Sequence, residues 1–246
     1  GWILRDGDGY HLWYTGYNPD DGGEMRLGYA TSADGIRWSR HGEKPIYDVG
    51  WIEDVMVVAV GDSYYMFAEG QGDRAYLLTS KDKIAWTSQG TLDIRQVNGT
   101  ALSPGPFGTP TGWYEGGTWY LFYERDDEAI WLAKSSDMKI WTNVQDEPVM
   151  ERGPDEYDKA MLALDQIVKY EGRYYALYHG LIPESSPQEW TTAIAVSDDL
   201  VHWRKYAGNP ILRNDQSSPV LVADGDAFRL YTMHPQVNLH MPVLSR

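Results

Sequence analysis

Residues 53–69 read Glu-Asp-Val-Met-Val-Val-Ala-Val-Gly-Asp-Ser-Tyr-Tyr-Met-Phe-Ala-Glu and predict two short β-strands joined by a tight turn. The strands are rich in β-branched and aromatic residues, and Gly-Asp-Ser at 61–63 forms the turn. Because hairpin strands are antiparallel, the residue that opens the first lies beside the residue that closes the second. Asp54 is therefore expected beside Glu69, with Glu53 nearby, so that carboxylates gather at one end of an apolar ribbon.

The second strand of this hairpin recurs along the whole chain. Its leading aromatic residues are Tyr10, Tyr64, Trp119, Tyr174 and Phe228, at intervals of 54, 55, 55 and 54 residues. A second motif, Ser-x-Asp-x-x-x-Trp, lies between successive copies and begins at Ser32, Ser80, Ser135 and Ser197. Five units of nearly equal length, each holding several short strands, are typical of a β-propeller. The sequence predicts an all-β, five-bladed β-propeller that forms a single domain over residues 1–246.

The two ends of the chain fall inside blades in this prediction. Trp2 aligns with Met56, in the middle of the first strand of a blade, so the position equivalent to Asp54 in blade one would precede Gly1. The N-terminal part of blade one is therefore expected to be missing. Blade five shows two clear strands and a third expected over residues 236–243. A preceding segment is expected to supply its fourth strand and close the ring.

Composition narrows the class of partner. The formal net charge of −15 at pH 7 disfavours nucleic acid and anionic membranes, because ligands of the same sign are repelled. The chain has no Cys, which excludes disulfides and thiol chemistry. No apolar run is long enough to span a membrane. Eleven Trp and 18 Tyr suit packing between blades and also stacking on sugar rings. A neutral oligosaccharide or polysaccharide is the expected partner, and the oligomeric state is left open.

Topology places the candidate site at one face of the ring. The short turns between strands one and two lie at one end, and the long connections between blades lie at the other, which marks the second face as functional. Strand ends at that face carry Glu53, Asp54 and Glu69 in blade two, Thr109, Glu124 and Arg125 in blade three, Asp165, Gln166 and His179 in blade four, and Ser217, Ser218, Met233 and His234 in blade five. The aromatic residues expected nearby are Trp51, Trp113, Tyr123, Tyr157 and Tyr178.

Such a ring of residues has the chemistry required for glycosidic bond cleavage. One carboxylic acid protonates the leaving oxygen, while a carboxylate activates water or attacks the anomeric carbon. Neighbouring carboxylates raise one another's pKa, which keeps one of them protonated near neutral pH. The candidate catalytic residues are Asp54, Glu124, His179, Asp165 and Glu69. The candidate substrate-binding residues are Glu53, Trp51, Thr109, Trp113, Arg125, Gln166, Ser218 and His234.

Several of these residues have a structural alternative. Glu69 could be the charge partner of Arg74, and His179 and His234 could be core histidines with satisfied hydrogen bonds. Acidic residues within 155–158 are interpreted as a solvated loop. No cofactor is predicted. A structural Ca²⁺ on the propeller axis would suit Asp and His side chains, but no dense Asp-x-Asp-x-Asp loop is present, so no metal is assigned.

These motifs resemble the five-bladed propeller glycoside hydrolases, a wide group that includes families 32, 43, 68, 117 and 130. The resemblance covers nearly the whole chain, through five Gly-x-Tyr-Tyr-Leu-Phe-Tyr-like strands and four Ala-Thr-Ser-x-Asp-Gly-Ile-x-Trp-like segments. For family 43 it implies an Asp base in blade one, an Asp that tunes pKa in blade two and a Glu acid in blade three. Asp54 matches the pKa-tuning Asp, and the Asp base would lie before Gly1. The Glu acid has no match, because blade three opens with Gly-Thr-Pro at 108–110. Glu124 is then the candidate acid, or His179, as a histidine is in family 117.

Three functions fit these observations. The leading hypothesis is a glycosidase acting on plant or algal oligosaccharides, with Glu124 or His179 as acid and Asp54 as base or modulator. Such an enzyme is expected in the periplasm or outside a bacterial cell. A glycoside phosphorylase is the alternative, and Arg125, His179 and His234 are the cationic residues available for phosphate. A non-catalytic carbohydrate-binding propeller is the third. The residues at the ends of the five second strands all differ, however, which favours one asymmetric central site. A protein-interaction scaffold ranks last, because the repeat is longer than WD repeats and lacks their Trp-Asp ending.

Overall fold

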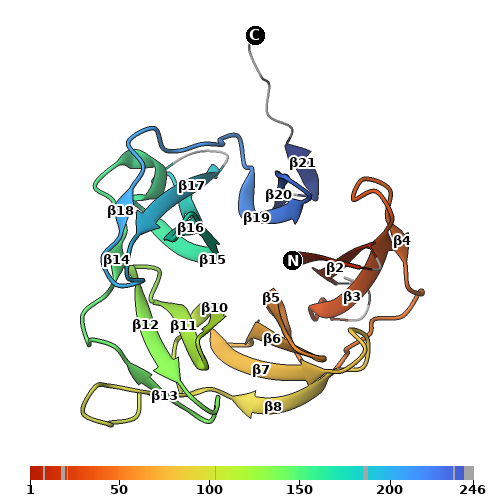
Figure 1. Ribbon diagram of the computed structural model, residues 1–246, viewed down its shortest axis with the longest axis horizontal. Helices are drawn as coiled ribbons and strands as arrows, with labels where there is room; N and C mark the ends of the chain where they lie inside the picture. Colours follow the sequence, from red (N-terminus) through yellow and green to blue (C-terminus); the bar gives the residue numbers. More distant parts are fainter. Residues whose placement is uncertain are drawn as a thin grey trace.

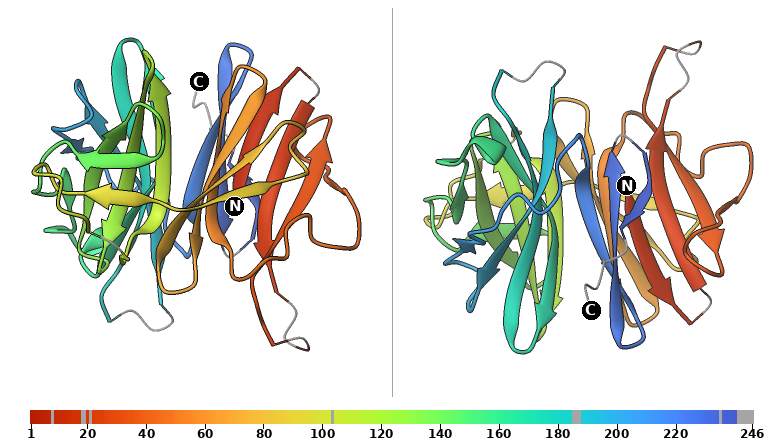
Figure 2. Two further views of the ribbon diagram at one scale, coloured as in Figure 1. Left: turned by 90° about the horizontal axis from the view of Figure 1, so that it is seen from below. Right: turned by 90° about the horizontal axis from the view of Figure 1, so that it is seen from above.

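The computed structural model describes residues 1–246 except 8, 18, 19, 21, 103, 185–187, 235 and 241–246. Its strands form five sheets around a central axis, so the structure is a five-bladed β-propeller (Figure 1). Figure 2 shows the ring edge on, with the sheets side by side. The predicted all-β class and the number of blades are confirmed. A 3₁₀ turn spans Glu156–Asp158, and within the described ranges no helix could cross a membrane.

In every blade the first strand lies next to the axis and the others follow outward. Blade one contains β1 (Trp2–Asp6), β2 (Gly9–Gly16), β3 (Arg26–Ser32) and β4 (Ser39–Arg40). Blade two contains β5 (Glu53–Val60), β6 (Ser63–Gly70), β7 (Arg74–Ser80) and β8 (Thr87–Thr91). Blade three contains β10 (Gly108–Glu115), β11 (Thr118–Arg125), β12 (Ala129–Ser135), β13 (Ile140–Asn143) and β14 (Met150–Glu151). Blade four contains β15 (Met161–Tyr170), β16 (Arg173–Leu181), β17 (Trp190–Ser197) and β18 (Arg204–Lys205), and blade five contains β19 (Ser217–Asp224), β20 (Ala227–His234) and β21 (Asn238–His240).

The connection from blade two to blade three contains a short strand of its own. This strand, β9 (Asp93–Arg95), pairs in parallel with β13 at the outer edge of blade three. In blade five, β21 lies within the third strand predicted over residues 236–243. Residues 241–243 of that prediction lie outside the described residues. Additional strand pairing at this edge stays a prediction.

The Ser-x-Asp turns are held by their own side chains. In blade two, the Ser80 hydroxyl accepts the backbone N–H of Lys83 at 3.0 Å, and the Asp82 carboxylate accepts those of Ile84 and Ala85 at 2.9 and 2.7 Å. The other three copies make closely similar bonds. Because these N–H groups bind the ionised carboxylate, they hold the pKa of Asp82 below its ordinary value. The motif is structural, as its regular recurrence indicates.

In three of the four motifs the tryptophan that ends the motif joins neighbouring blades. An aromatic residue of the preceding blade meets it edge to face, with ring centroids about 6 Å apart, a geometry worth about 0.5–1.5 kcal/mol beyond burial alone. The pairs are Trp13 with Trp86, Phe67 with Trp141 and Phe122 with Trp203. Blade five is fixed to blade one differently, because the Tyr231 hydroxyl donates to the Gly35 carbonyl at 3.0 Å. These contacts hold the blades at a fixed angle around the axis.

The connection from blade three to blade four corrects one sequence interpretation. Residues 155–158 were interpreted as a solvated loop, but Asp158 is completely buried. Lys205 Nζ donates to Asp158 Oδ2 at 2.6 Å and also to two backbone carbonyls of the same connection. A buried carboxylate is tolerated here because a cation and hydrogen bonds compensate its lost hydration. Asp158 therefore anchors the connection.

Candidate active site

Polar residues near the start of the inner strands lie at irregularities in the strand pairing, close to the propeller axis. In β5 and β10 the pairing register slips near the start of the strand, and Asp54 and Thr109 lie at these slips. Both have φ of 42°, and Ser218 of blade five has φ of 53°, a left-handed conformation that non-glycine residues rarely adopt. Asp165 lies at the equivalent slip in β15. Strain of this kind costs on the order of 1 kcal/mol per residue and often gathers at functional sites.

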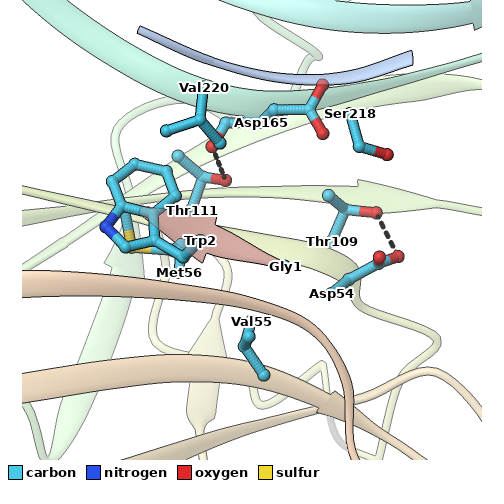
Figure 3. Close-up of a pocket in the computed structure, with 10 residues that line it drawn as sticks. All are labelled: Gly1, Trp2, Asp54, Val55, Met56, Thr109, Thr111, Asp165, Ser218 and Val220. Atoms are coloured by element: carbon cyan, nitrogen blue, oxygen red, sulfur yellow. Dashed lines mark hydrogen bonds between the residues drawn. The ribbon is translucent and has the colours of Figure 1, made fainter. Parts of the chain in front are cut away.

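These four side chains surround a small cavity on the axis (Figure 3). Its volume of about 20 Å³ is room for about one water molecule. The Thr109 hydroxyl donates to Asp54 Oδ2 across a distance of 3.4 Å. Asp54 and Thr109 also line a larger pocket, so the cavity adjoins it.

The larger pocket, called the axial pocket below, has a volume of about 210 Å³. It lies at the ends of the second strands, on the face that the topology predicted to be functional. Its lining residues are Asp54, Glu69, Asp73, Thr109, Glu124, Asp127, Met161, Leu162, Ala163, His179 and Trp190. Four of the five residues proposed as catalytic from the sequence thus meet in one pocket, and the fifth, Asp165, contacts His179.

Glu124 is held in the axial pocket from two sides. It lies in β11 opposite Gly108, and its Oε2 accepts the backbone N–H of Asp127 at 2.8 Å. A Cβ atom on Gly108 would lie 1.8 Å from Oε1, so the carboxyl group fits only because this residue is glycine. Burial raises the pKa of Glu124 to about 7. Near neutral pH this side chain is therefore present in both protonation states, as a general acid requires.

Glu69 lies in the same pocket one blade earlier. It pairs with Glu53 rather than with Asp54, because Asp54 occupies the register slip. Its Oε2 accepts the Thr109 backbone N–H at 2.8 Å, so its partner is this peptide group rather than Arg74, the alternative considered from the sequence. Burial and then the Asp54 charge raise the pKa of Glu69 to about 9. Glu69 therefore stays protonated at neutral pH.

His179 contributes an imidazole ring to the axial pocket. Its Nδ1 donates to the Asp165 carboxylate at 2.9 Å. Burial alone lowers the pKa of the imidazole, but Asp165, followed by Asp54 and Glu124, outweighs burial and raises it above its ordinary value. These carboxylates therefore favour the protonated form of the ring. Trp190 lies edge-on to it with ring centroids 5.4 Å apart.

Three acidic or aromatic residues of the pocket were not singled out from the sequence. Asp73 and Asp127 lie in the loops that leave the second strands of blades two and three, with φ of 52° and 59°. A signal for them was present, because these loops had been assigned to the functional face and the two aspartates are one repeat apart. Trp190 opens β17 where no repeated motif marks it. Its half-buried ring is the aromatic surface of the axial pocket.

Three predicted substrate-binding residues are not brought to the axial pocket. Trp113 packs edge-on against Tyr174, and the Arg125 guanidinium lies over the Trp131 ring at 5.2 Å. Alternate residues of a strand face opposite sides, so Arg125 faces away from its neighbour Glu124. The Gln166 side chain donates to the backbone carbonyl of Leu221 and accepts its N–H, which joins blades four and five.

The remaining predicted residues lie around the pocket or in the core. Tyr123, Tyr157 and Tyr178 are buried packing residues rather than sugar-stacking surfaces. His234 is half-exposed beside Trp190, with ring centroids 6.4 Å apart, and pairs with Ser217 in the sheet. Trp51 and Glu53 lie at an adjoining groove. The described side chains include no group of three or more His, Cys, Asp or Glu that could hold a metal ion.

The known proteins that are similar to this chain include propellers that act on glycosides. No protein-family model matches the chain. A 1,2-beta-oligomannan phosphorylase from Thermoanaerobacter sp. (strain X514) is 28% identical over 167 residues, which cover 63% of this chain and 52% of that protein. The chain thus spans about half the length of this curated relative.

Solved structures share the fold at low sequence identity. One of them belongs to the GH130 family of mannoside phosphorylases, which contains glycoside hydrolases that target β-1,2 mannosidic linkages in Candida mannan. It has a TM-score of 0.74 at 16% identity, and the match covers 96% of this chain and 81% of that chain. Beta-1,2-mannobiose phosphorylase from Listeria innocua has a TM-score of 0.69 at 20% identity, covering 88% and 66%. A thermostable family-43 glycoside hydrolase has a TM-score of 0.71 at 18% identity, covering 97% and 87%. The chain has the five-bladed fold of these glycoside-active propellers, both phosphorylases and hydrolases.

Proposed function

We propose that the axial pocket cleaves β-1,2-linked mannooligosaccharides and transfers the released mannosyl group to inorganic phosphate. The observation that carries the proposal is Glu124, a buried carboxylic acid with a pKa of about 7 in a pocket of further carboxylates and one aromatic ring. A group of this kind protonates a leaving glycosidic oxygen at neutral pH. The similarity to an oligomannan phosphorylase supports the choice of sugar and of acceptor.

The proposed reaction uses the described side chains in distinct roles. Glu124 donates its proton to the glycosidic oxygen as the bond from that oxygen to the anomeric carbon breaks. A phosphate oxygen forms the new bond to the anomeric carbon, which yields mannose 1-phosphate and a shortened saccharide. Glu69, protonated at neutral pH, donates a hydrogen bond to a sugar hydroxyl, and the Trp190 ring packs against a sugar face.

Phosphate requires a positive partner in the axial pocket. Of the three cationic residues considered from the sequence, His179 lines the pocket, whereas Arg125 lies over Trp131 and His234 lies beyond Trp190. The carboxylates around His179 favour its imidazolium form, which would give an anion a charge-assisted donor. Because Glu69 is protonated and Glu124 is partly so, the pocket repels phosphate less than its number of carboxyl groups suggests.

Hydrolysis, the leading hypothesis from the sequence, is the second candidate. It is favoured by the lining of the axial pocket, where five carboxyl groups accompany a single imidazole. In this reaction a water molecule takes the place of phosphate, and Asp54 is the carboxylate that activates it.

The acceptor is decided by incubating the protein with β-1,2-mannobiose, with and without inorganic phosphate. The proposal predicts that cleavage requires phosphate and yields equal amounts of mannose 1-phosphate and mannose. Two mannose molecules formed without phosphate would establish the hydrolase instead. The β-1,3- and β-1,4-linked mannobioses serve as linkage controls. No cleavage of any of the three, with the protein folded, would overturn both candidates.

The pH profile identifies the catalytic acid. If protonated Glu124 is the acid, kcat/KM is expected to fall as the pH rises through about 7, because deprotonation removes the transferable proton. The measurement is kcat/KM for β-1,2-mannobiose across the pH range in which the protein stays folded. A fall only near pH 9 would transfer the role to Glu69, whose pKa is about 9.

A further inference from the structure

A second groove, of about 330 Å³, lies beside the axial pocket. It is formed by the connection between blades one and two together with β6, β7 and β8. Its aromatic side chains are Tyr47, Trp51 and Tyr76, and Gln71 and Ser88 add polar groups to its lining. Aromatic surfaces with polar groups beside them are suited to sugar rings, which have apolar faces and hydroxyl edges.

Two of the aromatic rings are held in place by named contacts. Trp51 is 37% exposed, and its indole N–H donates to Glu53 Oε1 at 2.5 Å. Tyr76 lies over the backbone of Gly70, where an added Cβ would be 2.5 Å from the ring. A tryptophan with a core packing role is normally buried, whereas Trp51 is more than one-third exposed and hydrogen-bonded in a fixed orientation. Such a ring loses little conformational freedom when a ligand stacks on it.

The groove adjoins the axial pocket at Glu69. Glu69 lines both, and its strand partner Glu53 is the residue that holds the Trp51 indole. A saccharide with its cleaved bond in the axial pocket can therefore extend past Glu69 into the groove. The axial pocket, at about 210 Å³, is smaller than the roughly 300–1,000 Å³ usual for ligand pockets, so longer saccharides need additional space.

We infer that this groove is a further sugar-binding subsite, in which Trp51 stacks on a sugar residue of an oligosaccharide beyond the two that flank the cleaved bond. The inference rests on the proposed function and adds to it a preference for chains longer than a disaccharide. Its ligand is the same polymer, because the lining offers hydroxyl, amide and aromatic groups and Glu69 is protonated at neutral pH.

The test compares β-1,2-mannobiose with β-1,2-mannotetraose as substrates. In the unaltered protein kcat/KM is expected to be higher for the tetraose. Trp51→Ala is expected to reduce kcat/KM for the tetraose about tenfold more than for the biose, whereas Trp51→Phe, which keeps an aromatic face, restores most of the difference. Tyr206→Ala, which removes an exposed aromatic ring from blade four, is the matched control and should leave the ratio unchanged.

Failure of this inference is distinguishable from failure of the proposed function. Cleavage of both saccharides with the same ratio in Trp51→Ala as in the unaltered protein would overturn the subsite alone. If neither saccharide is cleaved, the proposed function fails. Calorimetric titration with β-1,2-mannotetraose then decides the subsite: binding that Trp51→Ala weakens supports it, and binding that is unchanged or absent overturns it.

Discussion

Glu124→Gln is expected to reduce turnover of a β-1,2-mannoside by about 10²–10⁴-fold, the usual contribution of general acid catalysis. The amide has nearly the shape of the protonated carboxyl group, and its oxygen can still accept the Asp127 N–H. It carries no transferable proton, so binding should change far less than kcat. Steady-state kinetics on the purified variant measure both. Turnover within threefold of the unaltered protein would remove Glu124 from the mechanism.

The same variant is expected to be more stable at alkaline pH. The pKa of Glu124 is raised from 4.5 to about 7, so the folded protein disfavours its ionised form. Ionisation therefore destabilises the fold progressively as the pH rises from about 4.5 to 7, by roughly 3 kcal/mol once complete. Gln cannot ionise, so thermal unfolding should show a higher Tm for the variant above pH 7 and no difference near pH 4. A lower Tm above pH 7 would show that the carboxylate is stabilised by contacts other than those described.

Gly108→Ala is expected to reduce turnover about 10²-fold without altering any group that takes part in the chemistry. The new methyl group would lie 1.8 Å from Glu124 Oε1, so the carboxyl group must move. A displacement of about 1 Å in a catalytic group is enough for a loss of this size. Gly108 is not among the residues with positive φ, so Ala can adopt its backbone conformation. The alkaline limb of the pH profile should also shift, because the environment of Glu124 changes.

Gly16→Ala is the matched control for this variant. Gly16 ends the second strand of blade one, also without a positive φ, and an added Cβ meets nothing within 4 Å. Its turnover and pH profile should equal those of the unaltered protein. If Gly108→Ala also leaves both unchanged, the close packing of Gly108 against Glu124 does not position the acid.

The repeat made the fold and the face of the site predictable from sequence. The intervals between Tyr10 and its equivalents define the number of blades, and the hairpin geometry brings Asp54, Glu69 and Glu124 to one end of the ring. These inferences depend on spacing and on the alternation of strands, which are local properties of the chain. The Ser-x-Asp turns are local in the same sense, because each is closed by bonds within six residues.

Other features depend on contacts between distant segments, and the sequence did not reveal them. The register slip at Asp54 is a backbone irregularity that pairs Glu69 with Glu53, and simple counting from the turn misses it. Gln166 has a side-chain amide of the kind that binds sugar hydroxyls. In the structure this amide forms hydrogen bonds with the backbone of Leu221 in the next blade. Asp158 lies in an acidic stretch that reads as solvated, and its burial is explained by Lys205, 47 residues further along the chain.

The sequence motifs also could not show whether the acceptor is phosphate or water. The repeat defines a scaffold that phosphorylases and hydrolases share, and the hydrolase hypothesis came from the carboxylates and from the resemblance to propeller glycoside hydrolases. The similarity to an oligomannan phosphorylase and the imidazole of His179 in the axial pocket support the proposal that phosphate is the acceptor.

The central claim is that Glu124 protonates the leaving oxygen in the axial pocket, and a change of leaving group tests it most directly. The measurement compares Glu124→Gln with the unaltered protein on β-1,2-mannobiose and on 2,4-dinitrophenyl β-mannoside, whose phenolate departs without protonation. If Glu124 is the acid, the variant should lose about 10²-fold or more on the disaccharide and less than about tenfold on the activated mannoside. Equal losses on both substrates would show that Glu124 binds or positions the sugar and that the proton comes from another group.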